Sequence, residues 1–348
     1  MNETKADETL EFVTTHIVAR YIYLAIFGLG LIGNTLNLIV FLRKTFRSNP
    51  CSIYFIVYSL NNYLVLTIGL LVRSLTNGFL LPLENDILLW CKIRRYLTHI
   101  NYLFSSSLLT MASINRYARV RQAQLTKNNH LYVLMCTHRT TGIIIAVLLI
   151  FCLLINLHIP FLFEIDQGLC YARPGLYRSL FDIFFLLFYG LCPILIMTVT
   201  NVATIIEIRH IRCLVHPTIS RKEFYFIALV IVHSILNAIL TLPYIINKFI
   251  SYQFVSSSPT KSFILGSAIA HLAFFMNHGV SFFLYTLTTT TFRRELRQAF
   301  NDCMAKIRTK KHACTDQQHL HIDQTKRRDT LISILNLAFP PRRSSCQS

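Results

Sequence analysis

The chain has 348 residues, of which 53% are hydrophobic and only 14% are charged, and its formal net charge is +18. A soluble domain usually carries about 25% charged residues, so this apolar excess indicates surface that contacts lipid rather than a larger core. The composition favours an integral membrane protein. The positive charge need not indicate nucleic-acid binding, because anionic inner-leaflet lipid also attracts Lys and Arg.

Seven long apolar runs predict seven membrane-spanning helices, because about twenty apolar residues in a helix cross the hydrocarbon core. The runs lie at 18–42, 53–72, 97–117, 141–163, 177–206, 224–250 and 263–287. Residues 1–17 are acidic and do not resemble a signal peptide, so the first run is expected to act as its own insertion signal. This tail contains an N-glycosylation sequon at Asn2, although such triplets also arise by chance.

The distribution of basic residues predicts the orientation of these helices. With the amino terminus outside, 24 of the 34 Lys and Arg residues fall in inner segments and ten in outer segments. This is the positive-inside bias of multi-pass membrane proteins. The sequence therefore predicts an extracellular tail at 1–17 and a protein of the plasma membrane.

The third run identifies the family that the chain resembles. Cys91 precedes the run, and Asn115-Arg116-Tyr117 ends it 24 residues later. This stretch resembles the third helix of rhodopsin-like G-protein-coupled receptors, in which a cysteine stands at the outer end and Asp-Arg-Tyr at the inner end. The tripeptide alone is a weak signal, but its distance from the cysteine and the six other runs strengthen it. The resemblance covers roughly residues 18–307.

The resemblance implies an all-α membrane protein: a seven-transmembrane helix bundle at 18–291 followed by a short amphipathic eighth helix. Its expected partners are an extracellular ligand, a heterotrimeric G protein, membrane lipids and arrestin. The family catalyses no reaction and needs no cofactor or metal. The sequence agrees, because it contains no His-Glu-x-x-His, Gly-x-Ser-x-Gly or phosphate-binding loop.

Taken in chain order, the first two helices carry polar residues that the resemblance assigns to the bundle interior. Asn34 follows Gly33 as in the family, and Asn62 stands where the family has an Asp that helps to hold sodium. The other groups that would surround the sodium are Ser105, Asn277 and Ser281. All four are neutral, so we expect weak sodium binding and hydrogen bonds among these groups, directly or through water. Alternatively, Asn62 is an ordinary hydrogen-bonded core residue.

The resemblance also locates a ligand pocket between the outer halves of the helices. Thr98 stands where amine receptors carry Asp, and Phe275 stands where opsins carry the retinal-binding Lys, so a monoamine and retinal are both excluded. The expected pocket residues are Arg73, Arg95, Thr98, His99, Tyr244, Lys248 and His271. Several are positive and suit an acidic group, although these cations could instead reach lipid headgroups. Similarity to invertebrate neuropeptide receptors favours a short peptide, with a small acid or lipid as the alternative.

Ten cysteines are present, but the predicted topology leaves only Cys91 and Cys170 outside. An oxidising exterior allows one pairing between them, which would tie the third helix to the second outer loop. The alternative is two free thiols.

The inner ends of the helices should carry the switch residues Asn115, Arg116, Tyr117, Glu223 and Tyr285. Following the family, we expect Arg116 to pair with Glu223 in the resting state. The competing interpretation is a capping box from Ser220 to Glu223. Tyr285 is what remains of the family's Asn-Pro-x-x-Tyr motif. Because several switch residues are replaced, a receptor-like protein with atypical or lost G-protein signalling is the alternative function.

The segment 292–307 predicts an amphipathic helix on the inner membrane surface, because its apolar residues recur at helical spacing. Cys303 on this face is a candidate for palmitoylation, and an unmodified buried thiol is the alternative. Residues 308–348 are polar and basic, so we expect a disordered cytoplasmic tail.

Overall fold

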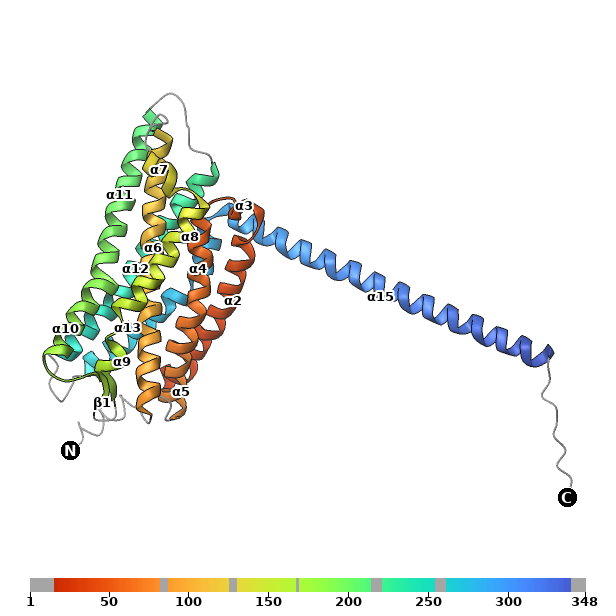
Figure 1. The fold of residues 1–348 in the computed structure, drawn as a ribbon, viewed down its shortest axis with the longest axis horizontal. Helices are drawn as coiled ribbons and strands as arrows, with labels where there is room; N and C mark the ends of the chain where they lie inside the picture. Colours follow the sequence, from red (N-terminus) through yellow and green to blue (C-terminus); the bar gives the residue numbers. More distant parts are fainter. Residues whose placement is uncertain are drawn as a thin grey trace, which may run out of the picture. The chain divides into compact units, whose positions relative to one another are not determined.

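The computed structural model describes residues 16–81, 87–124, 130–166, 169–213, 221–253 and 261–338. The chain divides into two compact units, Met1–Glu295 and Leu296–Ser348. The first unit is a bundle of long helices that lie side by side (Figure 1). Its helices are α2 (Tyr23–Phe41), α4 (Cys51–Leu64), α5 (Val72–Phe79), α6 (Leu88–Gln124), α8 (His138–Ile155), α10 (Leu176–Phe185), α11 (Cys192–Cys213), α12 (Arg221–Gln253), α13 (Lys261–Gly279) and α14 (Ser281–Thr288).

Three wider π-helical turns join neighbouring pieces into longer helices. They are η1 (Val18–Ile22) before α2, η2 (Val65–Leu71) between α4 and α5, and η3 (Leu186–Leu191) between α10 and α11. The short elements lie at the two ends of the bundle. One end, called the hairpin end, has α9 (Ile159–Leu162) and the strands β1 (Phe163–Asp166) and β2 (Leu169–Ala172); the opposite α3 end has α3 (Lys44–Arg47) and α7 (His130–Met135) (Figure 1).

Within the described residues, five helical stretches are long and apolar enough to cross a membrane: Val18–Phe41, Cys51–Phe79, His138–Leu162, Leu176–His210 and Glu223–Ile250. A sixth results if α13 and α14, which meet at an angle of 59°, form one bent span. The fold is therefore an α-helical bundle of the membrane type, as the composition predicts. The two-stranded antiparallel hairpin of β1 and β2 is an addition that the sequence analysis did not expect.

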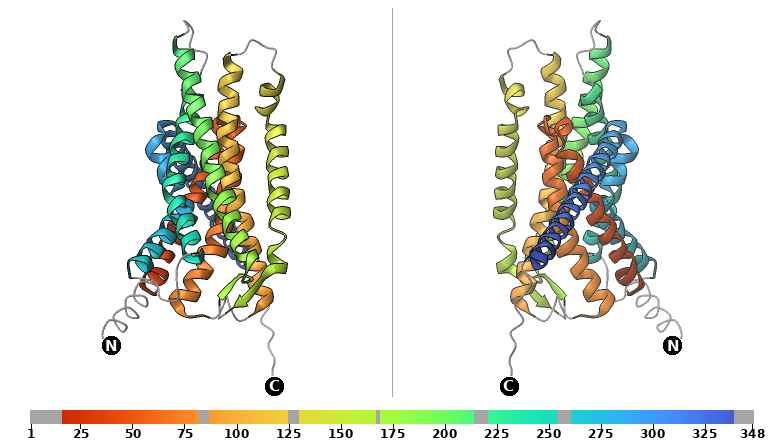
Figure 2. Two further views of the ribbon diagram at one scale, coloured as in Figure 1. Left: turned by 90° about the vertical axis from the view of Figure 1, so that its left-hand side faces the viewer. Right: turned by 90° about the vertical axis from the view of Figure 1, so that its right-hand side faces the viewer.

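Helix α6 is not among these stretches because many of its side chains are polar. Asn101, Ser105 and Ser113 are all buried, so α6 turns polar groups into the bundle. It packs against α4, α8, α11 and α12, and the two views of Figure 2 show it between its neighbours. A polar helix is tolerated there because other helices, rather than lipid, supply its hydrogen-bond partners.

Helices α2 and α13 approach closely at two glycines. A Cβ atom on Gly30 would lie 3.2 Å from the Cα of Gly279 and 2.6 Å from a methyl group of Leu66. A larger residue at position 30 would therefore push the helices apart. The break between α13 and α14 follows directly, at Val280, where the chain turns before Ser281.

Helix α15 (Thr290–Ala338) corrects the prediction for the end of the chain. The expected amphipathic segment 292–307 is its first part, and Phe292 is fully buried. The helix then continues past Ile307 to Ala338, where we expected disorder. The physical reason is visible in the sequence: neither Pro nor Gly occurs between 293 and 338, so nothing interrupts the helix locally. Residues 339–348 lie outside the described part.

Candidate functional site

A disulfide joins Cys91 to Cys170, and their Cα atoms are 5.8 Å apart. Cys91 lies in the first turns of α6, and Cys170 lies on β2. Both are buried. The predicted pairing is confirmed, and it fastens the hairpin to the central helix at the hairpin end of the bundle.

The hairpin rests on an aromatic cluster that fixes its position. Phe163 and Tyr171 from the two strands pack with Phe181 of α10, and the Phe163 and Phe181 rings lie 5.2 Å apart. The Tyr171 hydroxyl donates a hydrogen bond to Oδ1 of Asp182, which is buried on α10. The strands, α6 and α10 therefore form one continuous wall beside the space described next.

A small cavity lies next to this wall, between α5, α6, α12 and α13. Its volume of about 20 Å³ is room for little more than one water molecule. The residues that line it are Gly69, Arg73, Arg94, Arg95, Thr98, His99, Tyr102, Tyr244, Lys248 and Phe275. The structure therefore brings six of the seven expected pocket residues around one space.

The seventh expected residue, His271, lies behind the cavity wall. Its ring meets the Tyr244 ring edge-on at 4.9 Å, and its Nδ1 donates to the carbonyl of Ser267 at 2.8 Å. Arg94 is a lining residue that the sequence analysis missed, and it is 2% exposed. The sequence contained a signal for Arg94, because it is adjacent to Arg95. Two successive residues near the start of a helix lie at the same end of the bundle.

The lining of the cavity is polar and positively charged. Arg73 comes from α5, Arg94 and Arg95 from α6, and Lys248 from α12. The Lys248 ammonium lies over the Phe185 ring at 3.7 Å, a distance at which a cation is attracted to the ring face. The cations therefore converge from three helices on a space that only a small group can enter.

Two further polar groups face this space. Thr98 and His99 are both almost fully buried. Within the described part of the chain, Oγ1 of Thr98 and Nδ1 of His99 have no hydrogen-bond partner. Buried polar atoms are nearly always bonded, so these two atoms are available to a ligand or an ordered water.

A polar network crosses the middle of the bundle. Asn34 donates to the carbonyls of Gly30 at 2.8 Å and His278 at 3.0 Å. Asn62 donates to Oδ1 of Asn34 at 3.0 Å and accepts from Nδ1 of His278 at 3.0 Å. Asn62 is therefore an interior hydrogen-bonding residue that joins α2, α4 and α13.

The other three polar-core residues bond to partners that the sequence analysis did not name. Ser105 accepts from Asn61 at 2.6 Å. Asn277 donates to Asn237 at 2.8 Å, and Ser281 accepts from Asn37 at 3.0 Å. Asn62, Ser105, Asn277 and Ser281 therefore do not bond directly to one another, because each bonds to a side chain on a neighbouring helix instead. Their connection through water stays a prediction.

Tyr285 bonds to a histidine that was also missed. Its hydroxyl shares a hydrogen bond with Nδ1 of His233 on α12, at 2.7 Å. Both residues are buried, and the Tyr58 ring meets the His233 ring edge-on at 5.1 Å. This contact ties α14 to α12.

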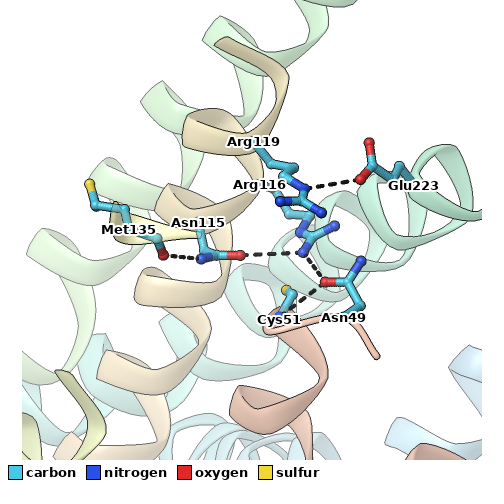
Figure 3. Close-up of polar contacts among 7 residues, drawn as sticks. All are labelled: Asn49, Cys51, Asn115, Arg116, Arg119, Met135 and Glu223. Carbon is cyan, nitrogen blue, oxygen red and sulfur yellow. Dashed lines mark hydrogen bonds and ion pairs between the residues drawn. The ribbon is translucent and has the colours of Figure 1, made fainter. Parts of the chain in front are cut away.

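At the α3 end, Arg116 is held by an amide (Figure 3). Its Nη2 donates to Oδ1 of Asn49 at 2.6 Å and to Oδ1 of Asn115 at 3.3 Å. The same Asn49 oxygen accepts from the backbone N–H of Cys51 at 3.1 Å, at the start of α4. Asn115 in turn donates to the carbonyl of Met135 at 2.9 Å. Arg116 therefore links α6 to the start of α4.

Glu223 does not have the partner that we expected. Its Oε1 pairs with Nε of Arg119 at 3.0 Å, one turn beyond Arg116 (Figure 3). The guanidinium of Arg116 instead lies 5.1 Å from the ring centre of Phe226 on α12. The expected pairing of Arg116 with Glu223 was wrong because Asn49 holds Arg116 toward α4. Tyr117 is half-buried beside these groups, and Ser220 of the alternative capping box lies outside the described residues.

The structure describes one of the two expected modification sites. Cys303 is exposed on α15, and its palmitoylation stays a prediction. Asn2 lies outside the described residues.

The comparisons with known proteins give no relative from which a function could be transferred. No protein-family model matches the chain, and no curated protein matches its sequence significantly. The functional argument therefore depends on the residues and their geometry.

Proposed function

We propose that the chain is a seven-span receptor of the rhodopsin-like type, which detects an extracellular ligand and signals to a heterotrimeric G protein. One observation carries the proposal. Helix α6 is continuous, with the Cys91 disulfide and the cationic cavity near one end and the contacts of Arg116 near the other. A ligand that changes the packing around the cavity would shift the population of arrangements around Arg116 through this helix.

The proposed seventh span is α6. Residues 96–115 contain no Asp, Glu, Lys or Arg, and the polar groups in this stretch are mostly buried, so α6 can cross a membrane when other helices surround it. The bent pair α13 and α14 is counted as one span. The basic-residue bias supports a plasma-membrane protein with an extracellular amino terminus, and hence with the hairpin end outside. An oxidising exterior also suits the disulfide.

The proposed ligand is a short peptide, and the residues of the cavity favour one with an acidic group. Four cationic side chains line the cavity, and carboxylates are their natural partners. A small acid or a lipid with an acidic headgroup is the second candidate, supported by the same cations and by the small volume. The other proposed features are a glycan on Asn2, a palmitoyl group on Cys303 and binding of arrestin.

The test is a screen of secreted peptides and small carboxylic acids against cells that express the receptor, with dissociation of G-protein subunits as the readout. We expect at least one acidic ligand to give a saturable response. Arg116→Ala at equal surface expression should abolish that response. If the surface-expressed protein gives no response to any ligand and no ligand-independent signal, the chain is a receptor-like protein without G-protein coupling.

A further inference from the structure

A groove opens on the surface of the bundle between α11 and α12, near the α3 end. Its volume is about 360 Å³, and seven of its eight described lining residues are apolar. Ile208 of α11 and Ile227 of α12 form its floor, because both are buried and pack with Val120 of α6. Ile205 and Phe224 form its rims and are 37% and 43% exposed. The described residues therefore leave an apolar groove open to the surroundings of the bundle.

The groove lies in a part of the bundle that a membrane would surround. The membrane-crossing stretch that contains α11 ends at His210, and the one that contains α12 begins at Glu223. The lining residues fall at 205–209 and 224–232, directly inside these two limits. The eight residues from Phe224 to Val232 cover about 12 Å of helix, whereas one leaflet of the hydrocarbon core is about 15 Å deep. The groove therefore extends through most of one leaflet.

The width of the groove limits its occupant to a single chain. Dividing the volume by the length of about 12 Å gives a mean cross-section of about 30 Å². An α-helix with its side chains is about 10 Å wide, so its cross-section of about 80 Å² is too large. A helix of a second copy could therefore cover the groove but could not fill it. A hydrocarbon chain is narrow and flexible enough to fit, and it gains van der Waals contacts with the apolar lining.

Arg209 determines which lipid suits the groove. It is the one charged residue among the described lining residues, and it is exposed. It precedes His210, where the membrane-crossing stretch ends, so its guanidinium can reach the depth of the lipid headgroups. The acidic residue of α11, Glu207, pairs with Arg121 of α6 at 2.8 Å, so its charge is directed toward α6. Arg binds phosphate through charged hydrogen bonds, and a basic group beside a groove between membrane-spanning helices suits an anionic headgroup.

We propose that this groove binds an anionic phospholipid, with one acyl chain along Ile208, Ile227 and Ile231 and the phosphate group on Arg209. With the proposed orientation, the groove opens into the inner leaflet, where the anionic lipids of a plasma membrane are concentrated. The site needs a membrane around the bundle but neither a ligand nor a G protein. It is therefore independent of the proposed function.

The test is quenching of tryptophan fluorescence by brominated lipids in bilayers that contain the full-length protein. The chain has one tryptophan, Trp90, near the start of α6 at the hairpin end. Trp90→Phe removes this fluorophore, and Ile235→Trp places a single probe one turn beyond Ile231, at an exposed position outside the lining. Brominated phosphatidylserine and brominated phosphatidylcholine with identical chains are compared in a background of unbrominated phosphatidylcholine.

We expect phosphatidylserine to bind beside the probe about five-fold more tightly than phosphatidylcholine, because one Arg near a membrane surface contributes about this factor. Arg209→Gln should remove most of this preference. Ala228→Phe places a ring in the groove, so quenching by both lipids should fall and the preference should be lost. The matched control is Arg139→Gln, because Arg139 is an exposed cation at the same end of the bundle, on α8. This variant should keep the full preference.

Three results would overturn the proposal. If Arg209→Gln lowers the preference no more than Arg139→Gln does, the overall positive charge of the protein attracts the lipid. If folded Ala228→Phe protein keeps the full quenching and preference, the lipid lies on the surface and not in the groove. If neither lipid quenches the probe, another protein chain covers the groove. None of these readouts contains a G protein, so protein that binds the lipid but does not signal would contradict the proposed function alone.

Discussion

The ion pair between Arg119 and Glu223 should restrain the α3 end of α12 in the ligand-free protein. It joins α6 to the first turn of α12 through a 3.0 Å contact between Nε of Arg119 and Oε1 of Glu223, and the two side chains are 33% and 23% exposed. A partly exposed ion pair contributes about 0.5–1 kcal/mol. Loss of the pair should therefore change the ratio of active to resting states by roughly 2–5-fold, if only the resting state contains it.

The perturbation is Glu223→Gln, which keeps the size of the side chain and removes its charge. We expect ligand-independent G-protein signalling to rise about 2–5-fold at matched surface expression. Arg119→Gln should give a similar rise, and the double variant should give little more, because both changes remove the same interaction. The matched control is Glu207→Gln, which breaks the 2.8 Å pair of Arg121 with Glu207, a pair that joins α6 to α11.

Two results would refute this reasoning. Unchanged basal signalling in Glu223→Gln and Arg119→Gln, in a protein that responds to ligand, would mean that the pair does not distinguish the states. A rise in Glu223→Gln without one in Arg119→Gln would mean that Glu223 acts through another partner, and Arg116 would again be the first to consider.

Three further predictions concern the bundle itself. Replacing Cys91 or Cys170 by Ala should reduce surface expression sharply, because a crosslink across 79 residues stabilises the fold by about 4 kcal/mol; normal expression of folded variants would contradict this. Tyr285→Phe should lower the thermal midpoint, because the lost hydroxyl leaves Nδ1 of buried His233 unpaired at a cost of about 1–3 kcal/mol, and an unchanged midpoint would argue against the contact. Replacing sodium by choline should leave the midpoint unchanged, because Asn62 is neutral and already bonded on both sides; a several-degree change that Asn62→Ala abolishes would refute this.

The disulfide and the residues around the cavity were predictable because they depend only on the end of the bundle at which each residue lies. Cys91 and Cys170 are the two cysteines that the topology leaves outside, so their pairing needed no knowledge of packing. The pocket residues needed only helix boundaries and the end of the bundle to which each residue belongs. Arg94 was missed because the sequence does not show which face of α6 is turned inward.

The partners of the polar groups could not be predicted in the same way. Arg116 and Arg119 are three residues apart and share one face of α6, so spacing alone does not decide which of them meets Glu223. Asn49 determines the outcome because it accepts a hydrogen bond from Arg116. Asn49 lies in the connection between α3 and α4, and the sequence does not specify the path of this connection. The roles of His233 and His278 were not predicted, because their partners come from helices distant in sequence.

Helix α15 illustrates a conflict between two kinds of sequence signal. The low apolar content of residues 308–338 indicates disorder, because such a segment cannot bury a core. The absence of Pro and Gly and the many Lys, Arg, Gln and Leu residues favour a helix locally. The structure follows the local preference as far as Ala338.

The most direct test of the central claim is nucleotide exchange on purified heterotrimeric G proteins by the full-length protein in lipid nanodiscs. Glu223→Gln removes the proposed restraint, so the measurement needs no identified ligand. We expect this variant to accelerate exchange above empty nanodiscs for at least one G-protein class, and Arg116→Ala in the same background to return exchange to the empty-disc rate. Exchange at the empty-disc rate for every class, by protein shown to contain the disulfide between Cys91 and Cys170, would contradict the assignment as a G-protein-coupled receptor.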